Sequence, residues 1–310
     1  MDFRLTEDQR DLRAGVRAML ARRYGREALR ESVPESGAGA VVDRGLWREL
    51  GEAGFFSLRL PESEGGVGLG LPEAVLVFEE AGRALLPGPL VATHLAAGVV
   101  PGAASGSAVV TAFDLGGPLV AYLGEADAVL GAPGLPAGEP VRSVDPLTPL
   151  WRSAGVLPPE FREAGTLLTA ALQLGSALRT VELAVRHAGE REQFGQPIGG
   201  FQAVKHLCAQ MLVRAEVART AVYAAAVTGD AAEIAAAKLL ADEAAVRGAR
   251  DCLQVHGGMG FTWEADVHLH LKRAWVRAEQ WHTAAESEEL LAARLAEESR
   301  PEREREPQRG

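Results

Sequence analysis

Apolar positions recur at helical spacing in the first eighty residues of the chain. Thr6 and Gln9 have the spacing of a capping box, and an amphipathic pattern follows them, so we expect a helix that begins near residue 6. A second helical pattern lies near residues 46–54 and ends in glycine. A third begins at Pro72 and continues to Arg83, because proline is favoured in the first turn of a helix. The N-terminal part is therefore predicted to be helical.

The pattern then changes twice along the chain. Between residues 101 and 155, short apolar runs are separated by glycine and proline clusters, which predicts the strands of a small sheet within Ala108–Phe113 and Leu119–Leu123. Long helical patterns return over roughly 160–188, 201–228, 230–256 and 278–296. We expect a mainly α protein with an N-terminal helical domain (1–100), a shortened middle β region (101–155), a C-terminal four-helix domain (156–296) and a disordered tail (297–310).

Composition and charge exclude several classes of function. The net charge is −10, whereas a nucleic-acid-binding surface requires an excess of Lys and Arg. Cys208 and Cys252 lack the spacing of a zinc motif, and His268 and His270 have no carboxylate or cysteine at ligand spacing, so we assign no disulfide and no metal. No apolar run is long enough to span a membrane, and the first residues do not resemble a secretion signal. We expect a cytoplasmic protein.

The first segment with candidate chemistry is the polar run that follows the helix predicted over 160–188. Arg191 offers a planar fork of donors to a phosphate, Gln193 offers an amide, and Phe194 can lie against an aromatic ring such as adenine. An ordinary loop between two helices, with an exposed arginine and a buried phenylalanine, explains the same residues. The segment is a candidate anion site with this alternative open.

The second candidate segment ends the helix predicted over 230–256. Gln254 is followed by Gly257 and Gly258, and adjacent glycines let a ligand approach the backbone and its N–H groups. A simple helix C-cap is the alternative for these glycines. The surrounding helical patterns exclude a dinucleotide-binding βαβ unit, in which the glycines follow a strand.

Taken together, the two segments resemble the C-terminal domain of the acyl-CoA dehydrogenase family. Three N-terminal runs match the family in the same order, namely Trp47–Gly54, Leu60–Leu69 and Glu79–Arg83. The resemblance covers about residues 3–100 and 145–295. It implies an FAD at a subunit interface.

The resemblance also assigns roles to the two segments. Arg191, Gln193 and Phe194 match residues that face the ADP part of the neighbouring subunit's FAD. Gln254 and the backbone of Gly257–Gly258 match the other half of the same contact. We call these six residues the ADP clamp.

The catalytic glutamate of the family is missing at both positions where the family carries it. Such a glutamate removes the α-proton of an acyl-CoA while the β-hydride passes to the flavin, and its two positions fall on Gly165 and Trp281. Neither side chain accepts a proton. Glu163 and Glu279 each lie two residues earlier, but two residues turn a helical side chain by about 200°, so we expect both to be solvated. We therefore assign no catalytic residue.

The middle region is also too short for the family's β-barrel, which holds the flavin ring and the acyl-CoA. We expect a subunit of a heteromeric FAD-dependent acyl-CoA dehydrogenase, inactive alone, that resembles the short subunits of α2β2 enzymes oxidising steroid side-chain CoA thioesters. A full-length sister subunit would supply the glutamate and most of the acyl-CoA site, and an electron acceptor would reoxidise the flavin. Two alternatives remain: a self-sufficient homomeric dehydrogenase that uses Glu163 or Glu279, and a structural helical protein without flavin.

Overall fold

The computed structural model describes residues 4–33 and 40–299. The described residues of the N-terminal part form the α-helices α1 (Glu7–Arg23), α2 (Arg26–Glu31), α3 (Arg44–Glu52), α4 (Leu71–Arg83) and α5 (Leu90–Leu95). The predicted capping box begins α1, because Thr6 Oγ1 accepts from the Gln9 N–H at 3.2 Å and Gln9 Oε1 accepts from the Thr6 N–H at 3.1 Å. The helices predicted over 46–54 and from Pro72 correspond to α3 and α4.

The middle region forms two small sheets. β1 (Val110–Thr111) pairs in parallel with β3 (Ala128–Val129). A second, antiparallel sheet has the order β2-β5-β4, from β2 (Leu119–Ala121), β5 (Leu150–Arg152) and β4 (Glu139–Val141). The runs predicted as strands near residues 108–113 and 119–123 contain β1 and β2. Sheets this small are stable only against neighbouring helices.

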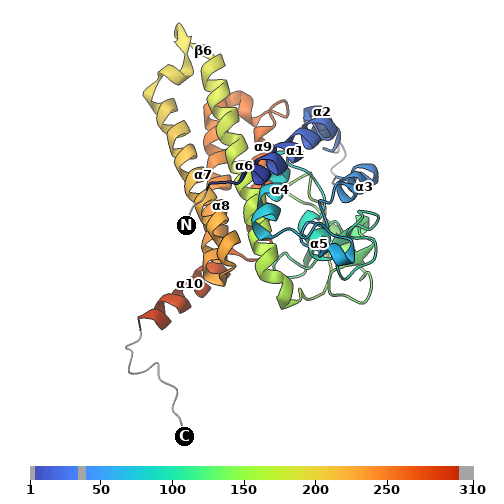
Figure 1. The fold of residues 1–310 in the computed structure, drawn as a ribbon. Helices are drawn as coiled ribbons and strands as arrows, with labels where there is room; N and C mark the ends of the chain where they lie inside the picture. The colour runs from blue at the N-terminus through green and yellow to red at the C-terminus, as the bar shows by residue number, and fades with distance from the viewer. Residues whose placement is uncertain (1–3, 34–39, 300–310) are drawn as a thin grey trace.

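The C-terminal part is built on three long helices, α6 (Arg162–Glu190), α7 (Gln202–Thr228) and α8 (Ala231–His256), which pack along one another (Figure 1). The hairpin of β6 (Glu192–Gln193) and β7 (Gln196–Pro197) joins α6 to α7 at one end of this bundle. Two further helices follow, α9 (Val267–Ala278), which packs against α8 and α6, and α10 (Ala284–Glu298), which contacts α8 and then extends outward.

The fourth predicted helix requires a correction. The range 278–296 contains the end of α9, a break around Trp281 and most of α10, so the fourth packed helix is α9. The sequence pattern does not predict α9, because most of its residues are buried. Its first apolar residues alternate with histidines, so they do not form the single apolar stripe of an amphipathic helix. The predicted disorder of 297–310 does not extend to Glu298, which ends α10, and residues 300–310 lie outside the described residues.

One hydrophobic cluster extends through all three parts of the chain. α4 and α6 approach so closely that a Cβ added to Gly82 would lie 2.0 Å from the Leu172 carbonyl oxygen, and one on Gly175 would lie 1.8 Å from that of Glu79. Only glycine allows this backbone contact. The domain boundaries at residues 100 and 155 stay a prediction.

Among residues 4–33 and 40–299, none of the helices has the length and apolar composition that a membrane span requires.

Candidate functional site

The hairpin after α6 presents Phe194 to solvent in a strained conformation. Its two-residue turn is Phe194–Gly195, with φ of 54° and 78°, which is the left-handed pair of a type I′ turn. Asn-Gly usually occupies such a turn, and a bulky residue there costs about 1–3 kcal/mol. The Phe194 side chain is 92% exposed, so burial does not compensate this strain. The predicted alternative of a buried phenylalanine is wrong, because the ring meets the Phe201 ring edge-on, with centroids 6.0 Å apart, and otherwise faces solvent.

Arg191 lies at the base of the same hairpin. Its backbone N–H donates to the His187 carbonyl at 2.9 Å, and its carbonyl accepts from the Ile198 N–H at 2.8 Å, so the backbone is held at both sides. The Arg191 side chain is exposed and has no ion-pair partner among residues 4–33 and 40–299. Its neighbour Gln193 donates from Nε2 to the Glu192 carbonyl at 2.7 Å. The hairpin therefore offers a free guanidinium on a fixed backbone.

The other half of the candidate clamp ends α8. Gly257 is its C-cap, with φ 61°, and the Gly257 N–H donates to the Gln254 carbonyl. The C-cap alternative is thus correct as local structure. A Cβ added at Gly257 or Gly258 would meet no atom within 4 Å, so the backbone also faces open space. The side chain of Gln254 is exposed beside it.

Two stacked imidazole rings bring these segments together. His187 lies one helical turn before Arg191, His256 directly precedes Gly257, and their ring centroids are 4.1 Å apart with planes inclined by 16°. Burial, the neighbouring His256 and Arg191 lower the pKa of His187, so this ring is neutral at physiological pH. The sequence reasoning missed this contact, and only the position of each histidine next to a clamp segment hinted at it.

The clamp residues fit the ADP part of an FAD by their chemistry. A free guanidinium and an open glycine backbone suit phosphate oxygens, and an exposed aromatic ring suits adenine. When bound, FAD supplies a flavin ring that accepts a hydride.

Gly165 and Trp281 face each other across the space between α6 and the loop that precedes α10. A Cβ added to Gly165 would lie 2.0 Å from the Trp281 ring, so the ring occupies the space above this glycine. Trp281 is 3% exposed and has φ 64°, and its N–H donates to the Asp114 carbonyl at 2.6 Å. Glu163 and Glu279 are both exposed, as predicted. The carboxyl group beside this contact is that of Asp114, which lines the same cavity as Trp281 and accepts from Gln280 Nε2 at 2.9 Å.

A small cavity beside Trp281 is lined by buried cationic and hydroxyl side chains. Its volume is about 30 Å³, which is room for molecules the size of water but not for a tricyclic ring. Arg273 pairs with Asp145, and Arg277 donates to the Leu172 carbonyl at 3.3 Å. Burial, and then Arg273, lowers the pKa of Arg277 to about 9. Nη2 of Arg273 and Oγ1 of Thr169 are buried with no hydrogen-bond partner among the described residues.

Comparison with known proteins identifies the family. The model of the acyl-CoA dehydrogenase C-terminal domain matches residues 163–297, and that of the N-terminal domain matches residues 6–110. Acyl-CoA dehydrogenase IpdE2 of Mycobacterium tuberculosis is 36% identical over 86% of this chain and 91% of its own length. IpdE2 of Mycolicibacterium smegmatis is 34% identical over 87% and 93%.

A solved structure agrees with this result. The ChsE4–ChsE5 complex from M. tuberculosis contains a chain that is 27% identical, with a TM-score of 0.83, over 97% of this chain and 100% of that one. The chain thus belongs to the acyl-CoA dehydrogenases, a family of FAD-binding flavoproteins.

Proposed function

We propose that the chain is the short subunit of a heteromeric, FAD-dependent acyl-CoA dehydrogenase with α2β2 composition. Its ADP clamp holds the ADP part of an FAD whose reactive ring lies in a full-length sister subunit. That subunit supplies the catalytic glutamate and most of the acyl-CoA site, and an electron acceptor reoxidises the flavin. The substrate class is a steroid side-chain CoA thioester.

One observation carries the proposal. The clamp is exposed and its Arg191 side chain has no ion-pair partner among the described residues, while the Trp281 ring covers Gly165, and these two positions match those of the family's base. A subunit that keeps the clamp but has no room for the catalytic base suits a flavin held between two different chains. The 30 Å³ cavity beside Trp281 supports the same division, because a flavin ring and an acyl group need far more room.

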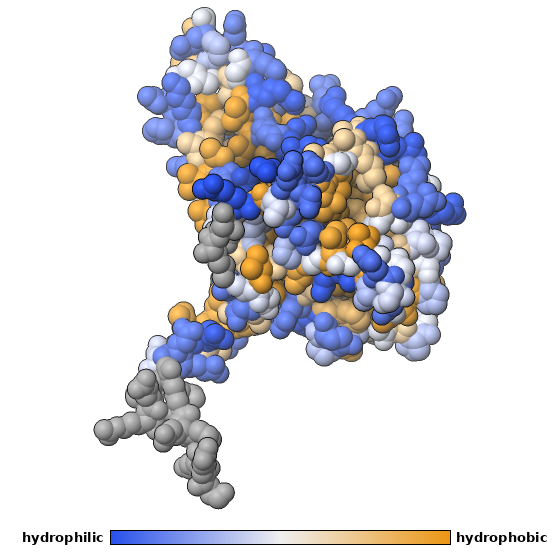
Figure 2. All heavy atoms as spheres, viewed as in Figure 1, coloured by the Kyte–Doolittle hydropathy of each residue, from blue (hydrophilic) through white to orange (hydrophobic). Residues whose placement is uncertain are grey.

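An exposed apolar surface on α7 supports the proposal that the chain binds a protein partner. Leu212, Val213 and Val217 are 47%, 62% and 48% exposed, and apolar surface is visible over the bundle in Figure 2. Helical neighbours of this kind mark an interface when they are contiguous. The sister subunit is the occupant we assign, since the ChsE4–ChsE5 relative is described as a complex of two proteins.

The substrate class rests on relatives. The resemblance to short subunits of steroid-oxidising enzymes motivates it, and the IpdE2 proteins are relatives of nearly the same length. Among structures of the same fold is the Tcur3481–Tcur3483 steroid enzyme, at 24% identity and a TM-score of 0.81.

The two alternatives make different predictions. A self-sufficient homomeric enzyme requires Glu163 or Glu279 as its base, and the exposure of both side chains argues against this role. A structural subunit without flavin leaves the strained, exposed Phe194 unexplained. The exposed clamp therefore favours the heteromer.

The experiment is co-expression with the full-length sister subunit. Wild-type complex is expected to be yellow with bound FAD, whereas Arg191→Ala should weaken FAD retention by about tenfold or more, since hydrogen bonds to charged groups contribute about 1.5–3 kcal/mol. Arg142→Ala is the matched control, because Arg142 is exposed and lies in the middle region. FAD retention is read from the flavin absorbance after gel filtration. Equal FAD content in both variants would refute the clamp assignment.

A further inference from the structure

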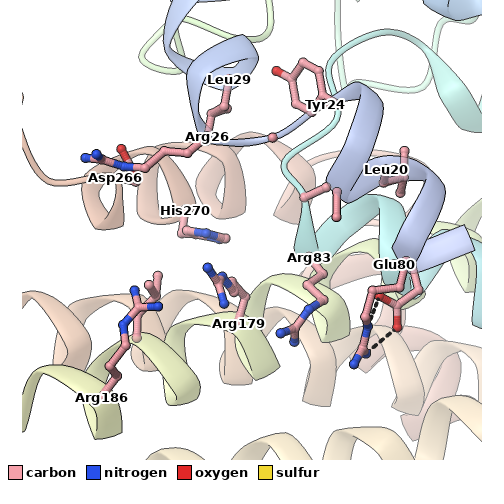
Figure 3. Close-up of a pocket in the computed structure, with 15 residues that line it drawn as sticks. Leu20, Tyr24, Arg26, Leu29, Glu80, Arg83, Arg179, Arg186, Asp266 and His270 are labelled. Atoms are coloured by element: carbon pink, nitrogen blue, oxygen red, sulfur yellow. Dashed lines mark hydrogen bonds and ion pairs between the residues drawn. The ribbon is translucent and has the colours of Figure 1, made fainter. Parts of the chain in front are cut away.

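A large cavity is lined by residues other than those of the clamp and of the Trp281 contact. It has a volume of about 480 Å³, is open to solvent on one side and is lined by residues of α1, α2, α4, α6 and α9 (Figure 3). This volume is in the range of small-molecule sites. We infer that it binds an amphipathic organic anion, that is, a carboxylate or phosphate attached to an apolar skeleton. The inference does not depend on the proposed role of the clamp.

Positive charge is concentrated in this cavity although the whole chain carries −10. Two carboxylates line it, Glu80 and Asp266, against five arginines: Arg17, Arg26, Arg83, Arg179 and Arg186. Arg17 is paired with Glu80, the two joined through Nη2 and Oε1 at 2.6 Å, and Arg26 Nε is 2.6 Å from Asp266 Oδ2. These two pairs account for both carboxylates of the lining.

The other three arginines have too few partners. Arg83 and Arg179 both contact the single carboxylate of Glu182, with Arg179 Nη1 at 3.1 Å from Oε2. Arg186 has no ion-pair or hydrogen-bond partner among residues 4–33 and 40–299. Figure 3 shows Arg179 and Arg186 rising from α6 and Arg83 lying beside Arg179 on α4. Each guanidinium carries five N–H donors, so this row has unused capacity for an anion.

The imidazole at the inner end of the cavity adds no charge. His270 is 3% exposed, and Ser176 Oγ lies 2.8 Å from its Nδ1. Burial, and then Arg179, lowers the pKa of His270 to about 3, so the ring stays neutral. The cationic surface is therefore the arginine row alone.

Apart from the Tyr24 hydroxyl, the remaining lining is apolar, which is why the ligand is amphipathic rather than a bare ion. Leu20, Leu29 and Leu183 are buried side chains of this wall, and Ala21 and Ala84 also line the cavity. An apolar skeleton placed here would leave water, while its head group met the arginines.

The test uses the full chain and four probes at one ionic strength: decanoate, decyl phosphate, decanol and inorganic phosphate. Titration calorimetry is expected to give at least about tenfold tighter binding of one or both charged ten-carbon probes than of decanol or phosphate, since charge-assisted contacts add to apolar burial. The tighter of the two charged probes identifies the head group. Four equal affinities, or no binding, would overturn the inference.

Variants distinguish binding in the cavity from a general effect of the protein's charge on anion binding. Arg186→Glu should weaken decanoate and decyl phosphate by about tenfold or more, because it reverses the free charge of the row. Arg48→Glu is the matched control, since Arg48 is also an exposed helical arginine without an ion-pair partner among the described residues. Arg186→Ala serves as the second variant if the charge reversal disturbs folding, which circular dichroism reports. Equal losses at positions 186 and 48, or none at 186, would contradict the site.

Discussion

At the scale of single residues, Trp281 has a conformation that its neighbours impose. Its backbone is in the left-handed region, where a bulky residue costs about 1–3 kcal/mol, and its side chain is 3% exposed. A residue keeps such an unfavourable backbone conformation only when packing contacts with its neighbours stabilise it. Here the surroundings are Gly165 and the Asp114 backbone, and the tryptophan ring fills the space above Gly165, which we propose is closed to a catalytic base.

Gly165 and Trp281 should be energetically coupled. Gly165→Ala would force a Cβ into the indole ring, and overpacking of this kind destabilises by about 1–3 kcal/mol. Combined with Trp281→Gly, which removes the ring and suits the left-handed backbone, the same alanine should cost nothing or stabilise the helix. Urea unfolding of the two single variants and the double variant measures the coupling.

The control is Gly189→Ala, because Gly189 also lies in α6 and an added Cβ there meets no atom within 4 Å. It should be neutral or stabilising by about 0.5–1 kcal/mol. If Gly165→Ala and Trp281→Gly were additive, the two residues would not be in contact.

Asp114 should make stability depend on pH. Burial raises the pKa of its carboxyl to about 7, although Gln280 Nε2 donates to it at 2.9 Å. Between pH 4 and 7 the unfolded chain releases this proton while the folded chain keeps it, so the contribution of Asp114 to stability falls as pH rises. The free energy of unfolding of wild type minus that of Asp114→Asn is expected to decrease as pH rises across this window. An increase of this signed difference with pH would contradict the raised pKa.

At the scale of elements, α7 is the helix whose exposed face we assign to the sister subunit. Val213 and Val217 are one turn apart and both exposed. Val213→Asp/Val217→Asp should leave the chain folded and abolish the complex in gel filtration, because it would place two charges in an apolar interface. Val144→Asp/Val156→Asp is the control, since both valines are exposed and lie outside α7. Loss of the complex in both variants would disprove a specific α7 interface.

The same scale separates what local sequence predicts from what it does not. The capping box of α1 and the glycine after α7 were predictable, because each acts within a few residues. The break around Trp281 was not, because the left-handed backbone of a tryptophan depends on its packing against Gly165, far away in the sequence. The two clamp segments were found as motifs, but their approach through His187 and His256 depends on how α6 and α8 pack.

At the scale of the whole molecule, one core connects three parts that the sequence pattern separates. Net charge indicated only an acidic protein, yet the fold gathers five arginines from four helices into one cavity. Such a cluster has no signature along the chain, because Arg17, Arg26, Arg83, Arg179 and Arg186 become neighbours only through packing. Membership of the family, by contrast, could be recognised from motifs that occur in the same order along this chain as in the family.

The central claim is that this chain binds the ADP part of an FAD whose reactive ring lies in the sister subunit. The most direct measurement is the ratio of FAD to polypeptide in the purified heteromer, from flavin absorbance and quantitative amino-acid analysis. If this chain has a clamp but no catalytic position, the heteromer should contain one FAD for each pair of unlike subunits. This chain alone should contain none. One FAD per polypeptide, or FAD bound by this chain alone, would contradict the account.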